Sequence, residues 1–368
     1  MSQKVLSILV HAGFSSDVME VVGNYNKRNR HYHDMLHIHE MLDYVEKAIA
    51  ESHLIDCDPI FIDSCIFSGD DTLAIKLAVI FHDVIYDVKS RTNEEDSAQA
   101  FVECVRKYVR QGSLMLERLL SITPLVVDLI IATKHHDIDA AHGNAERLII
   151  RADLDRFTRP FPEMWNGYLK LFREYAIYDL TEFKSGRAEF LEQYKEKIKY
   201  ILPKVAIDNI DKQITALEVW QPKIAVYPGS FNPMHIGHLN IIEKAEKIFD
   251  KVIIVVGENS DKSQRQYEIP KAILDSHQVD YYSGLLSDYV ASKDYPVTVI
   301  RGLRNTTDMQ YELNQYRWLQ ELNANFNMVS IFCDKEFEHI SSSAIRSLTK
   351  YKGQIEDNVF FGKYLINS

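Results

Sequence analysis

Two hydrophobic patterns divide the chain near residue 203. Before that point, apolar residues recur every three or four positions, which is the period of amphipathic helices. The clearest runs are Met35, Ile38, Met41, Leu42, Val45 and Ile49, followed by Ala74, Leu77, Ala78, Phe81 and Ile85. Further helices are predicted over residues 98–110, 125–135 and 165–178. The first half is therefore predicted to be all-α.

After residue 223, short apolar runs rich in β-branched residues alternate with helical stretches. The runs cover residues 224–227, 252–256, 297–300 and 328–332. This alternation predicts a parallel β-sheet with helices on both faces. Ligands of such sheets bind where the strands end, so functional residues should follow the runs directly. The predicted domains are 1–203 and 223–368. The polar stretch 204–222 is predicted to link them, either as an irregular segment or as a short helix.

Composition limits the function classes. A chain of 368 residues with 46% hydrophobic and 26% charged residues suffices for two domains with their own cores. The net charge of −11, without a long basic run, argues against a general binder of nucleic acids or anionic membranes. No apolar stretch approaches the ~20 residues of a membrane span, and no signal peptide is evident, so we expect a cytoplasmic protein. Four scattered cysteines predict neither disulfides nor a zinc knuckle.

A glycine-containing loop follows the first predicted strand. Residues 228–238 read PGSFNPMHIGH and continue into an amphipathic helix. Gly229 lets backbone amides approach a ligand, and Gly237 lets the helix start pack closely. His235 and His238 are three residues apart, so both can face one anion. The loop therefore predicts a phosphate site, against the alternative of a tight turn with two surface histidines.

Phosphate-binding groups are also predicted after later strands. Lys262 follows the second run and its polar loop, and Arg301 and Arg304 follow the third. Lysine supplies a mobile charge, whereas arginine supplies a rigid fork for phosphate oxygens. Serines 341–343 open the last predicted helix. Taken singly, these residues also fit a solvated lysine, surface ion pairs and an ordinary helix cap. Together they predict a cradle for a polyphosphate.

The segment from Lys223 to about Lys350 resembles the phosphopantetheine adenylyltransferase family. Five blocks match in order and spacing: YPGSFNPMHIGH, FDKVIIVVGENSDK, GLLSDYV, VIRGLRNTTDMQYE and ISSSAIR. The resemblance implies a Rossmann-like nucleotidyltransferase domain. It implies transfer of AMP from Mg²⁺-bound ATP to 4′-phosphopantetheine, giving dephospho-CoA and pyrophosphate without a covalent intermediate. It also implies a homo-oligomer.

The same resemblance implies roles for individual residues. It places His238, Lys262 and Arg304 at the reacting phosphates. It implies that ATP and the acceptor are bound by Gly229, Ser230, Phe231, His235, Gly237, Arg301, Gly302, Asp308, Glu312, Ser341, Ser342 and Ser343. Asn232 and His235 stand where the family commonly has aspartate and threonine. An adenylyltransferase acting on NMN, NaMN or another phosphate-bearing acceptor is therefore the alternative.

In the first half, histidines and aspartates lie where separate helices are predicted. His33 and His37 are four apart, which is the spacing of one helix face. His82-Asp83 and His135-His136 end two apolar runs, and Asp153 lies in the stretch RADLDR. Imidazoles and carboxylates converging from several helices suit a divalent metal ion. The alternative is a set of hydrogen-bonded core histidines.

The stretch from Asn24 to about Tyr200 resembles the HD superfamily of metal-dependent phosphohydrolases. It carries YHxxxH, FHDxxYD, NExxSA, a T-x-HH helix end and a DxD-like turn. The resemblance implies the metal ligands His37, His82, Asp83 and Asp153. The metal would be Mn, Fe, Co, Zn or Mg, and its bound water would attack a phosphate ester or anhydride of a nucleotide-like metabolite.

Further residues complete this prediction. Glu94, or alternatively Asp87, is predicted to orient or deprotonate the attacking water. His136 or Lys134 is predicted to hold the phosphate, and His33 is a candidate neighbour of the metal ligands. The whole chain is thus predicted to be a bifunctional enzyme with an adenylyltransferase and a phosphohydrolase. In the alternative, the helical domain senses a nucleotide and regulates the transferase.

Overall fold

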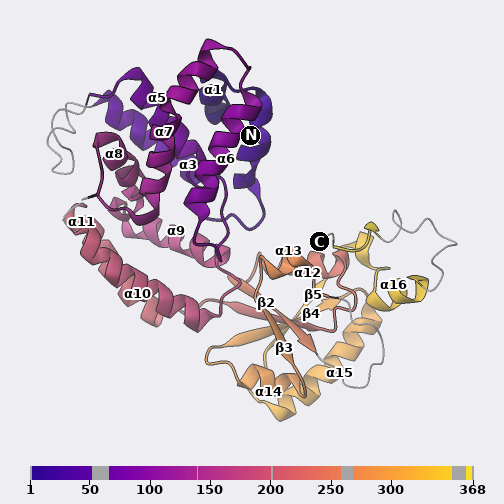
Figure 1. The fold of residues 1–368 in the computed structure, drawn as a ribbon. Helices are drawn as coiled ribbons and strands as arrows, with labels where there is room; N and C mark the ends of the chain where they lie inside the picture. The colour runs from indigo at the N-terminus through magenta and orange to yellow at the C-terminus, as the bar shows by residue number, and fades with distance from the viewer. Residues whose placement is uncertain are drawn as a thin grey trace. The chain divides into compact units, whose positions relative to one another are not determined.

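The computed structural model describes residues 2–51, 66–138, 140–199, 202–257, 268–349 and 362–366. The chain forms two compact units (Figure 1). The first comprises Met1–Glu174 and Lys184–Glu218, and the second comprises Tyr175–Phe183 and Val219–Ser368. The first unit is helical, and the second contains a β-sheet with helices. Among the described residues, no helix is both long enough and apolar enough to cross a membrane.

Helices make up the first unit. They are α1 (Gln3–His11), α2 (Met19–Val22), α3 (Met35–Ala50), α5 (Gly69–Phe81), α6 (Asn93–Tyr108), α7 (Leu114–His135), α8 (Asn144–Asp153), α9 (Phe161–Glu174), most of α10 (Leu180–Ile198) and α11 (Lys204–Val219). Short 3₁₀ turns cover Ser16–Val18, Gly23–Asn26 and Asp155–Thr158. One hydrophobic core joins α1, α2, α3, α5, α6, α7 and α8.

Helix α5 is the central helix of this core. Its side chains from Leu73 to Phe81 are buried with one exception, as expected of a helix surrounded by others. A capping box fixes its start, because Ser68 and Asp71 each accept a hydrogen bond from the other's backbone amide at 3.0 Å. The helix ends at Phe81, so that His82 and Asp83 follow it directly.

Helix α7 is longer than its hydrophobic pattern predicted. The prediction began after Pro124, but the helix runs from Leu114 through this proline to His135. Leu116, Leu119 and Ile122 are buried before the proline, so apolar packing outweighs the hydrogen bond that the proline cannot make.

The second unit contains five parallel strands in the order β3-β2-β1-β4-β5. They are β1 (Ile224–Gly229), β2 (Lys251–Gly257), β3 (Val279–Tyr282), β4 (Val297–Leu303) and β5 (Met328–Phe332). The helices between and after them are α12 (Ile236–Ala245), α13 (Lys271–Leu274), α14 (Leu286–Ala291), α15 (Thr306–Leu322) and α16 (Ser342–Thr349), with a 3₁₀ turn at Lys335–Phe337. Four strands lie where they were predicted, whereas β3 was not predicted because it is short and half-polar.

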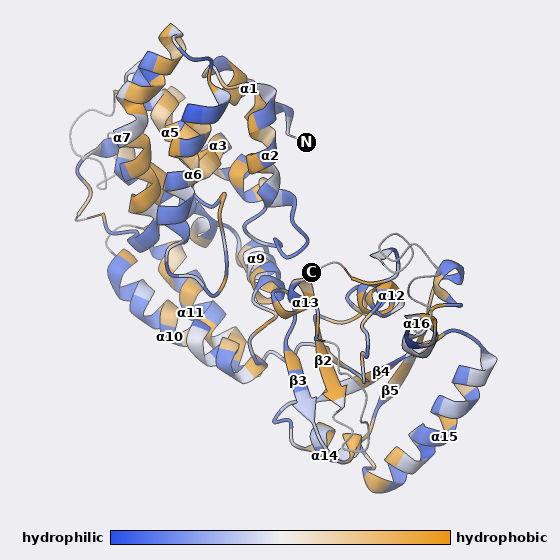
Figure 2. Cartoon of the chain, turned by 45° about the vertical axis from the view of Figure 1, so that its right-hand side comes forward, coloured by the Kyte–Doolittle hydropathy of each residue, from blue (hydrophilic) through white to orange (hydrophobic). Residues whose placement is uncertain are grey.

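Helices cover both faces of the sheet, as predicted. On one face, α12 and α13 pack against a core that includes Ile254 and Ile300. On the other, α14 and α15 pack with Val299, whose side chain points opposite to that of Ile300. A strand buried on both faces is apolar over a continuous run. In β2 this run covers Val252 to Val256, and Figure 2 shows the strand as largely hydrophobic.

The predicted boundary between the domains needs correction. Residues 204–219, predicted as part of a linker, form helix α11, which buries Ala206, Ile210 and Leu217 in the first unit. Instead, residues 175–183 leave the first unit and belong to the second. The pattern of 204–219 is weak because polar Asn209 and Gln213 occupy buried positions. The amide of Asn209 donates to the carbonyls of Phe157 and Arg159.

Residues 175–183 are fastened to the sheet by polar contacts. The ammonium of buried Lys251 donates to the carbonyl of Tyr178, and burial lowers the pKa of Lys251 to about 8. Asp179 accepts hydrogen bonds from the hydroxyl of Tyr295 at 2.5 Å and the amide of Thr181 at 2.9 Å. Burial alone would raise the pKa of Asp179, but these hydrogen bonds hold it below its ordinary value.

We therefore expect Asp179→Ala to lower the free energy of unfolding by about 1–2 kcal/mol, because it leaves partly buried donors without an acceptor. Urea unfolding followed by circular dichroism measures the change. The matched control is Asp294→Ala, at an exposed aspartate of the same unit. Equal losses in the two variants would contradict the anchoring role of Asp179.

Candidate functional sites

The loop after β1 is shaped by a close contact between Gly229 and Phe231. A Cβ atom at Gly229 would lie 2.9 Å from the ring of Phe231, so only glycine fits. Phe231 has a φ of 43°, and its ring is buried against Tyr227 and His238. The ring of Phe231, a residue predicted to bind a ligand, contacts the imidazole of His238.

His235 and His238 form a stacked pair at the start of α12. Their ring centroids are 3.7 Å apart, and the backbone amide of His235 donates to Nδ1 of His238 at 3.2 Å. Nδ1 is therefore an acceptor, so a neutral His238 carries its proton on Nε2.

Burial and neighbouring positive charge keep both histidines neutral. Burial, together with the charge of Arg304, lowers the pKa of His235 to about 4. The pKa of His238 lies well below its ordinary value because of burial, His235 and Arg304. Arg304 thus shares an electrostatic environment with both imidazoles, as the predicted cradle requires. The pair offers neutral hydrogen-bond donors for an anion.

Two acidic residues on α15 hold the two arginines. Asp308 binds the guanidinium of Arg304 through two hydrogen bonds of 2.8 and 3.0 Å. Nε of Arg301 lies 3.1 Å from Glu312, and another nitrogen of Arg301 donates to the carbonyl of Pro228. Asp308 and Glu312 were predicted to bind substrate directly. In the structure they orient the arginines, whose outer nitrogens are the groups suited to phosphate.

The remaining predicted residues of this site divide into three groups. Ser341 caps α16 by accepting from the amide of Ala344, and Ser342 donates to the carbonyl of Pro233, while Ser343 lies 3.5 Å from Arg346. Glycines 237 and 302 allow close packing. A Cβ atom at Gly237 would lie 3.1 Å from the ring of His235, and a Cβ atom at Gly302 would lie 2.9 Å from Ile241. Ser230 is exposed, and Lys262 lies outside the described residues.

Comparisons with known proteins match this unit. The Cytidylyltransferase-like family model matches residues 226–348. The phosphopantetheine adenylyltransferase of Syntrophomonas wolfei is 36% identical over 141 residues, which span 36% of this chain and 87% of that enzyme. The enzymes of Geotalea daltonii and Clostridium novyi are 37% and 36% identical over 142 residues, each spanning 36% of this chain and 88% of the relative. The chain belongs to the phosphopantetheine adenylyltransferase family.

Membership in this family rests on the α/β unit, which carries the matched residues. The model's match begins in β1 and ends in α16, so it includes the histidine pair, both arginines and the serine turn. The resemblance read from the five sequence blocks is thereby confirmed at the level of the family.

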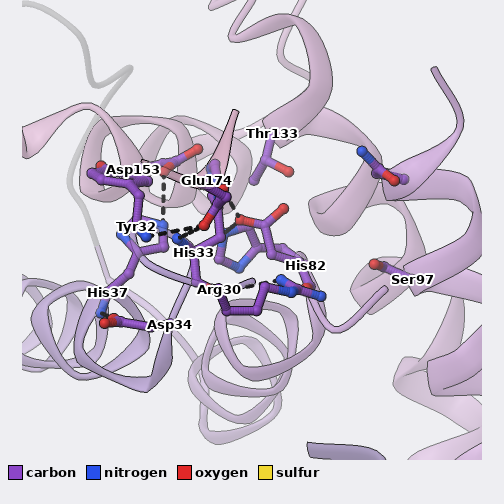
Figure 3. Close-up of polar contacts among 12 residues, drawn as sticks. Arg30, Tyr32, His33, Asp34, His37, His82, Ser97, Thr133, Asp153 and Glu174 are labelled. Carbon is purple, nitrogen blue, oxygen red and sulfur yellow. Dashed lines mark hydrogen bonds and ion pairs between the residues drawn. The ribbon is translucent and has the colours of Figure 1, made fainter. Parts of the chain in front are cut away.

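A second cluster lies in the helical unit. The ligand atoms of His37, His82 and Asp83 lie within 4.8 Å of one another, and all three residues are buried. His37 comes from α3, whereas His82 and Asp83 follow α5. Asp153, the last residue of α8, adds an oxygen 3.2 Å from Nε2 of His37. The structure thus brings together the four residues predicted as metal ligands, and Figure 3 labels three of them, His37, His82 and Asp153, among their neighbours.

The orientation of His82 suits a metal ion. Its Nδ1 lies 2.9 Å from the carbonyl of Val79, which assigns the proton of a neutral ring to Nδ1 and leaves the lone pair on Nε2. The Nε2 atoms of His37 and His82 are buried and lie 3.2 Å from Asp153 and 3.0 Å from Asp83, without hydrogen-bond geometry. Imidazole nitrogens and carboxylate oxygens that face one another in this way are the ligands that a divalent cation takes. The donor set therefore fits a metal.

The charges of the cluster are strongly coupled. Burial opposes ionisation of Asp83, but the charges of His82 and His33 hold its pKa well below the ordinary value. Burial likewise opposes a charged His82, yet Asp83 raises its pKa to about 9. Burial lowers the pKa of His37. The carboxylates are thus ionised, as ligands of a cation must be.

His33 does not share a helix face with His37, contrary to the prediction. The side chain of Asp34 caps α3 by accepting from the amides of Leu36 and His37, so the helix begins after His33. One oxygen of Glu174 accepts from the amides of residues 31–33 at 3.0 Å each, and the other contacts Nδ1 of His33 (Figure 3). Burial alone would raise the pKa of Glu174, but these contacts lower it to about 2.

Glu174 holds the loop that precedes the ligand His37, and Nε2 of His33 lies 3.9 Å from Asp83. The sequence prediction assigned Glu174 no role. The carboxylate of Glu174 accepts hydrogen bonds from backbone amides. Because every residue has such an amide, these bonds leave no pattern in the amino-acid sequence.

The predicted phosphate-binding residues of this unit are already engaged. Lys134 contacts Glu95 and donates to the carbonyl of Arg91, and Nε2 of His136 lies 2.7 Å from Asp153. Asp87 is exposed and caps a turn through the amide of Lys89. Glu94 is half-buried, and burial together with the charge of Asp83 raises its pKa. Of Glu94 and Asp87, Glu94 is therefore the better candidate for a proton acceptor.

The histidine pair generates a pH prediction. We expect the ring signals of His235 and His238 to stay constant from about pH 8 to about pH 5.5, because their pKa values in the folded protein are lowered. Proton NMR, assigned with His235→Gln and His238→Gln, measures this. The unfolded chain binds protons near pH 6.5, so the contribution of the pair to stability falls as the pH drops from about 6.5. Titration of either ring near neutral pH would contradict the prediction.

Proposed function

We propose that the α/β unit transfers AMP from ATP to 4′-phosphopantetheine. The relatives named above are phosphopantetheine adenylyltransferases. The observation that carries the proposal is the neutral, stacked pair of His235 and His238 beside Arg304, at the point where β1 ends.

The chemistry needs positioning more than it needs a base. The acceptor phosphate is already a nucleophile, so the site must hold two anions in line and stabilise the charge that develops on the departing pyrophosphate. The Nε2 hydrogen of His238 is suited to one phosphate oxygen, and the outer nitrogens of Arg301 and Arg304 to others. Mg²⁺, when bound with ATP, neutralises further phosphate charge. Asp308 and Glu312 keep the arginines oriented before the substrate arrives.

We further propose that copies of the chain associate. On α15, Met309, Tyr311, Leu313, Trp318 and Leu322 all expose apolar side chains to solvent. Figure 2 shows hydrophobic residues distributed along this helix. Apolar groups of this size gathered on one helix are typical of surfaces that a second protein covers.

For the helical unit, we propose metal-dependent hydrolysis of a phosphate ester or anhydride, as in the HD superfamily. His37, His82, Asp83 and Asp153 would hold the ion, which when bound supplies an activated water and polarises a phosphoryl oxygen. Glu94 would accept a proton from that water. The observation that carries this proposal is the convergence of two buried imidazoles and two carboxylates, with Nε2 of His37 3.2 Å from Asp153 and Nε2 of His82 3.0 Å from Asp83.

We expect Arg304→Ala to reduce kcat/KM for adenylyl transfer by about 100-fold, because it removes a charge that stabilises the transition state. Pyrophosphate release is measured with ATP and, in separate reactions, 4′-phosphopantetheine, NMN and NaMN. Lys247→Ala, at an exposed cation of the same unit, should leave the rate unchanged. Turnover of NMN or NaMN without turnover of phosphopantetheine would reject the proposed acceptor.

We expect His82→Ala to lower the amount of bound divalent metal at least about tenfold, since it removes a ligand from a buried site. Equilibrium dialysis of the full chain with Mn²⁺, Fe²⁺, Co²⁺, Zn²⁺ or Mg²⁺, followed by metal analysis, measures this. His142→Ala is the control, because the His142 side chain is 90% exposed.

A parent protein that binds none of these ions would overturn the metal site. A metal-loaded protein that cleaves no phosphate ester or anhydride, but whose transferase rate responds to a nucleotide, would instead favour a sensory role for the helical unit.

A further inference from the structure

Asn240 on α12 and Asp334 after β5 are joined by two reciprocal hydrogen bonds. The side-chain amide of Asn240 donates to Oδ2 of Asp334 at 2.7 Å, and the backbone amide of Asp334 donates to Oδ1 of Asn240 at 3.0 Å. Asn240 is 7% exposed, whereas about half of the Asp334 side chain is exposed. The sequence prediction assigned neither residue a role. Because the two bonds use different atoms of one amide, the pair fixes a direction as well as a distance.

The pair lies between two parts of the candidate phosphate site. Asn240 belongs to the helix that begins with the stacked pair of His235 and His238. Asp334 begins the connection that leads through a 3₁₀ turn to serines 341–343, which we call the serine turn. The two hydrogen bonds therefore join the helix of the histidine pair to the segment that carries the serine turn.

The backbone next to Asp334 also contacts the strand of the arginines. The amide of Cys333 donates to the carbonyl of Leu303 at 2.9 Å, and Arg304 follows Leu303 directly. Asp334 is thus tied to α12 by its own hydrogen bonds and to the end of β4 by its neighbour. The pair lies where the three phosphate-binding parts of the candidate site meet.

Lys244 keeps the carboxylate of Asp334 in its acceptor form. This lysine is one turn beyond Asn240 on α12, and its ammonium lies 2.6 Å from Oδ1 of Asp334. It also donates to the carbonyl of Phe332 at 2.7 Å. Lys244 and Asn240 hold the pKa of Asp334 below its ordinary value, so the carboxylate is ionised near neutral pH.

Apolar contacts hold the middle of the connection, and a hydrogen bond holds its far end. Phe337 and Ile340 pack with Ile236 at the start of α12, and Ser342 donates to the carbonyl of Pro233 at 2.9 Å. Apolar contacts have no preferred direction, so they allow a segment to slide. The position of the serine turn therefore depends on the hydrogen bonds at the two ends of the connection.

We propose that Asn240 and Asp334 are positioning residues, which fix the serine turn relative to the histidine pair and Arg304 and thereby set the affinity for ATP. The proposal rests on the adenylyl transfer proposed above for this unit, and it concerns the nucleotide and not the acceptor. Groups that are held in place before a ligand arrives lower the cost of binding it. Loss of the pair should therefore weaken ATP binding in a protein that is still folded.

The experiment titrates Mg²⁺-bound ATP into the full chain by isothermal calorimetry without an acceptor, so that binding is measured without turnover. Asn240→Asp should raise the Kd at least about tenfold, because it places two carboxylates against each other and removes one hydrogen bond. Asn240→Leu removes both bonds without adding a charge and should raise the Kd by a similar factor. Asn325→Asp, at an exposed asparagine of the same unit, is the matched control and should leave the Kd unchanged.

Exchange of the two side chains tests the contact itself. In the Asn240→Asp/Asp334→Asn double variant, the new carboxylate accepts from the amide of the new asparagine and from the backbone, so both hydrogen bonds return. We expect its Kd for ATP to return to within about threefold of the parent value. Asp334→Asn alone keeps both bonds and should bind ATP no more tightly than the parent. Tighter binding in that variant would indicate simple charge repulsion of ATP and would overturn the positioning role.

Steady-state kinetics separate positioning from a loss of folded protein. A smaller folded fraction lowers the apparent kcat and leaves each KM unchanged. In Asn240→Asp we expect the KM for ATP to rise with the Kd, whereas the KM for 4′-phosphopantetheine should stay within about twofold. An equal rise in both KM values would contradict a role confined to the nucleotide.

Should the Asn240 variants fail to fold, Asp334→Ala tests the same pair at an exposed position and should raise the Kd for ATP about threefold. An unchanged Kd in every folded variant, or no recovery in the double variant, would overturn the proposal and leave the proposed transfer intact. ATP binding that depends on the pair, in a protein that transfers AMP to no acceptor, would uphold the pair and reject the transfer. A parent protein that binds no ATP would overturn both.

Discussion

Removal of water from charged and polar side chains determines what each site of this protein can do. Burial makes an ion costly unless a partner of opposite charge or a hydrogen bond compensates. In the described part of the α/β unit no carboxylate compensates the histidine pair, so burial and Arg304 keep both rings neutral. In the helical unit Asp83 and Asp153 compensate, and a cluster of charged groups persists. The same physical constraint thus produces neutral imidazoles in one unit and ionised carboxylates in the other.

Both sites also depend on residues that orient other groups of the site. Asp308 orients Arg304, and Glu174 holds the backbone before His37. Such positioning lowers the cost of organising a site when the substrate arrives, because the side chains are already in place. The backbone contributes in the same way at Gly229, where the ring of Phe231 fills the space of a side chain and supports His238.

The sequence predicted most of the architecture and the residue types of both sites. The regular spacing of apolar residues predicted the long helices and four of the strands, because that spacing reflects which side chains are buried. The hydrophobic pattern did not predict elements in which polar residues are buried or partly buried. These are α11, with buried Asn209 and Gln213, and the half-polar strand β3. The four predicted metal ligands converge, but Glu174 was missed. Its contacts are with backbone amides, which are not visible in a one-dimensional pattern.

The connection between the units shows why the domain boundary could not be found from composition. A linker is recognisable in sequence when its residues have no partners. Here Glu174 is held by backbone amides of the helical unit, while the carbonyl of Ala176 accepts from the amide of Gln278 in the α/β unit. The residues on each side of this connection are therefore packed within a folded unit. Their aromatic and acidic side chains resemble those of the rest of the fold. The polar stretch that looked like a linker is a packed helix, in which the buried amide of Asn209 donates to the carbonyls of Phe157 and Arg159.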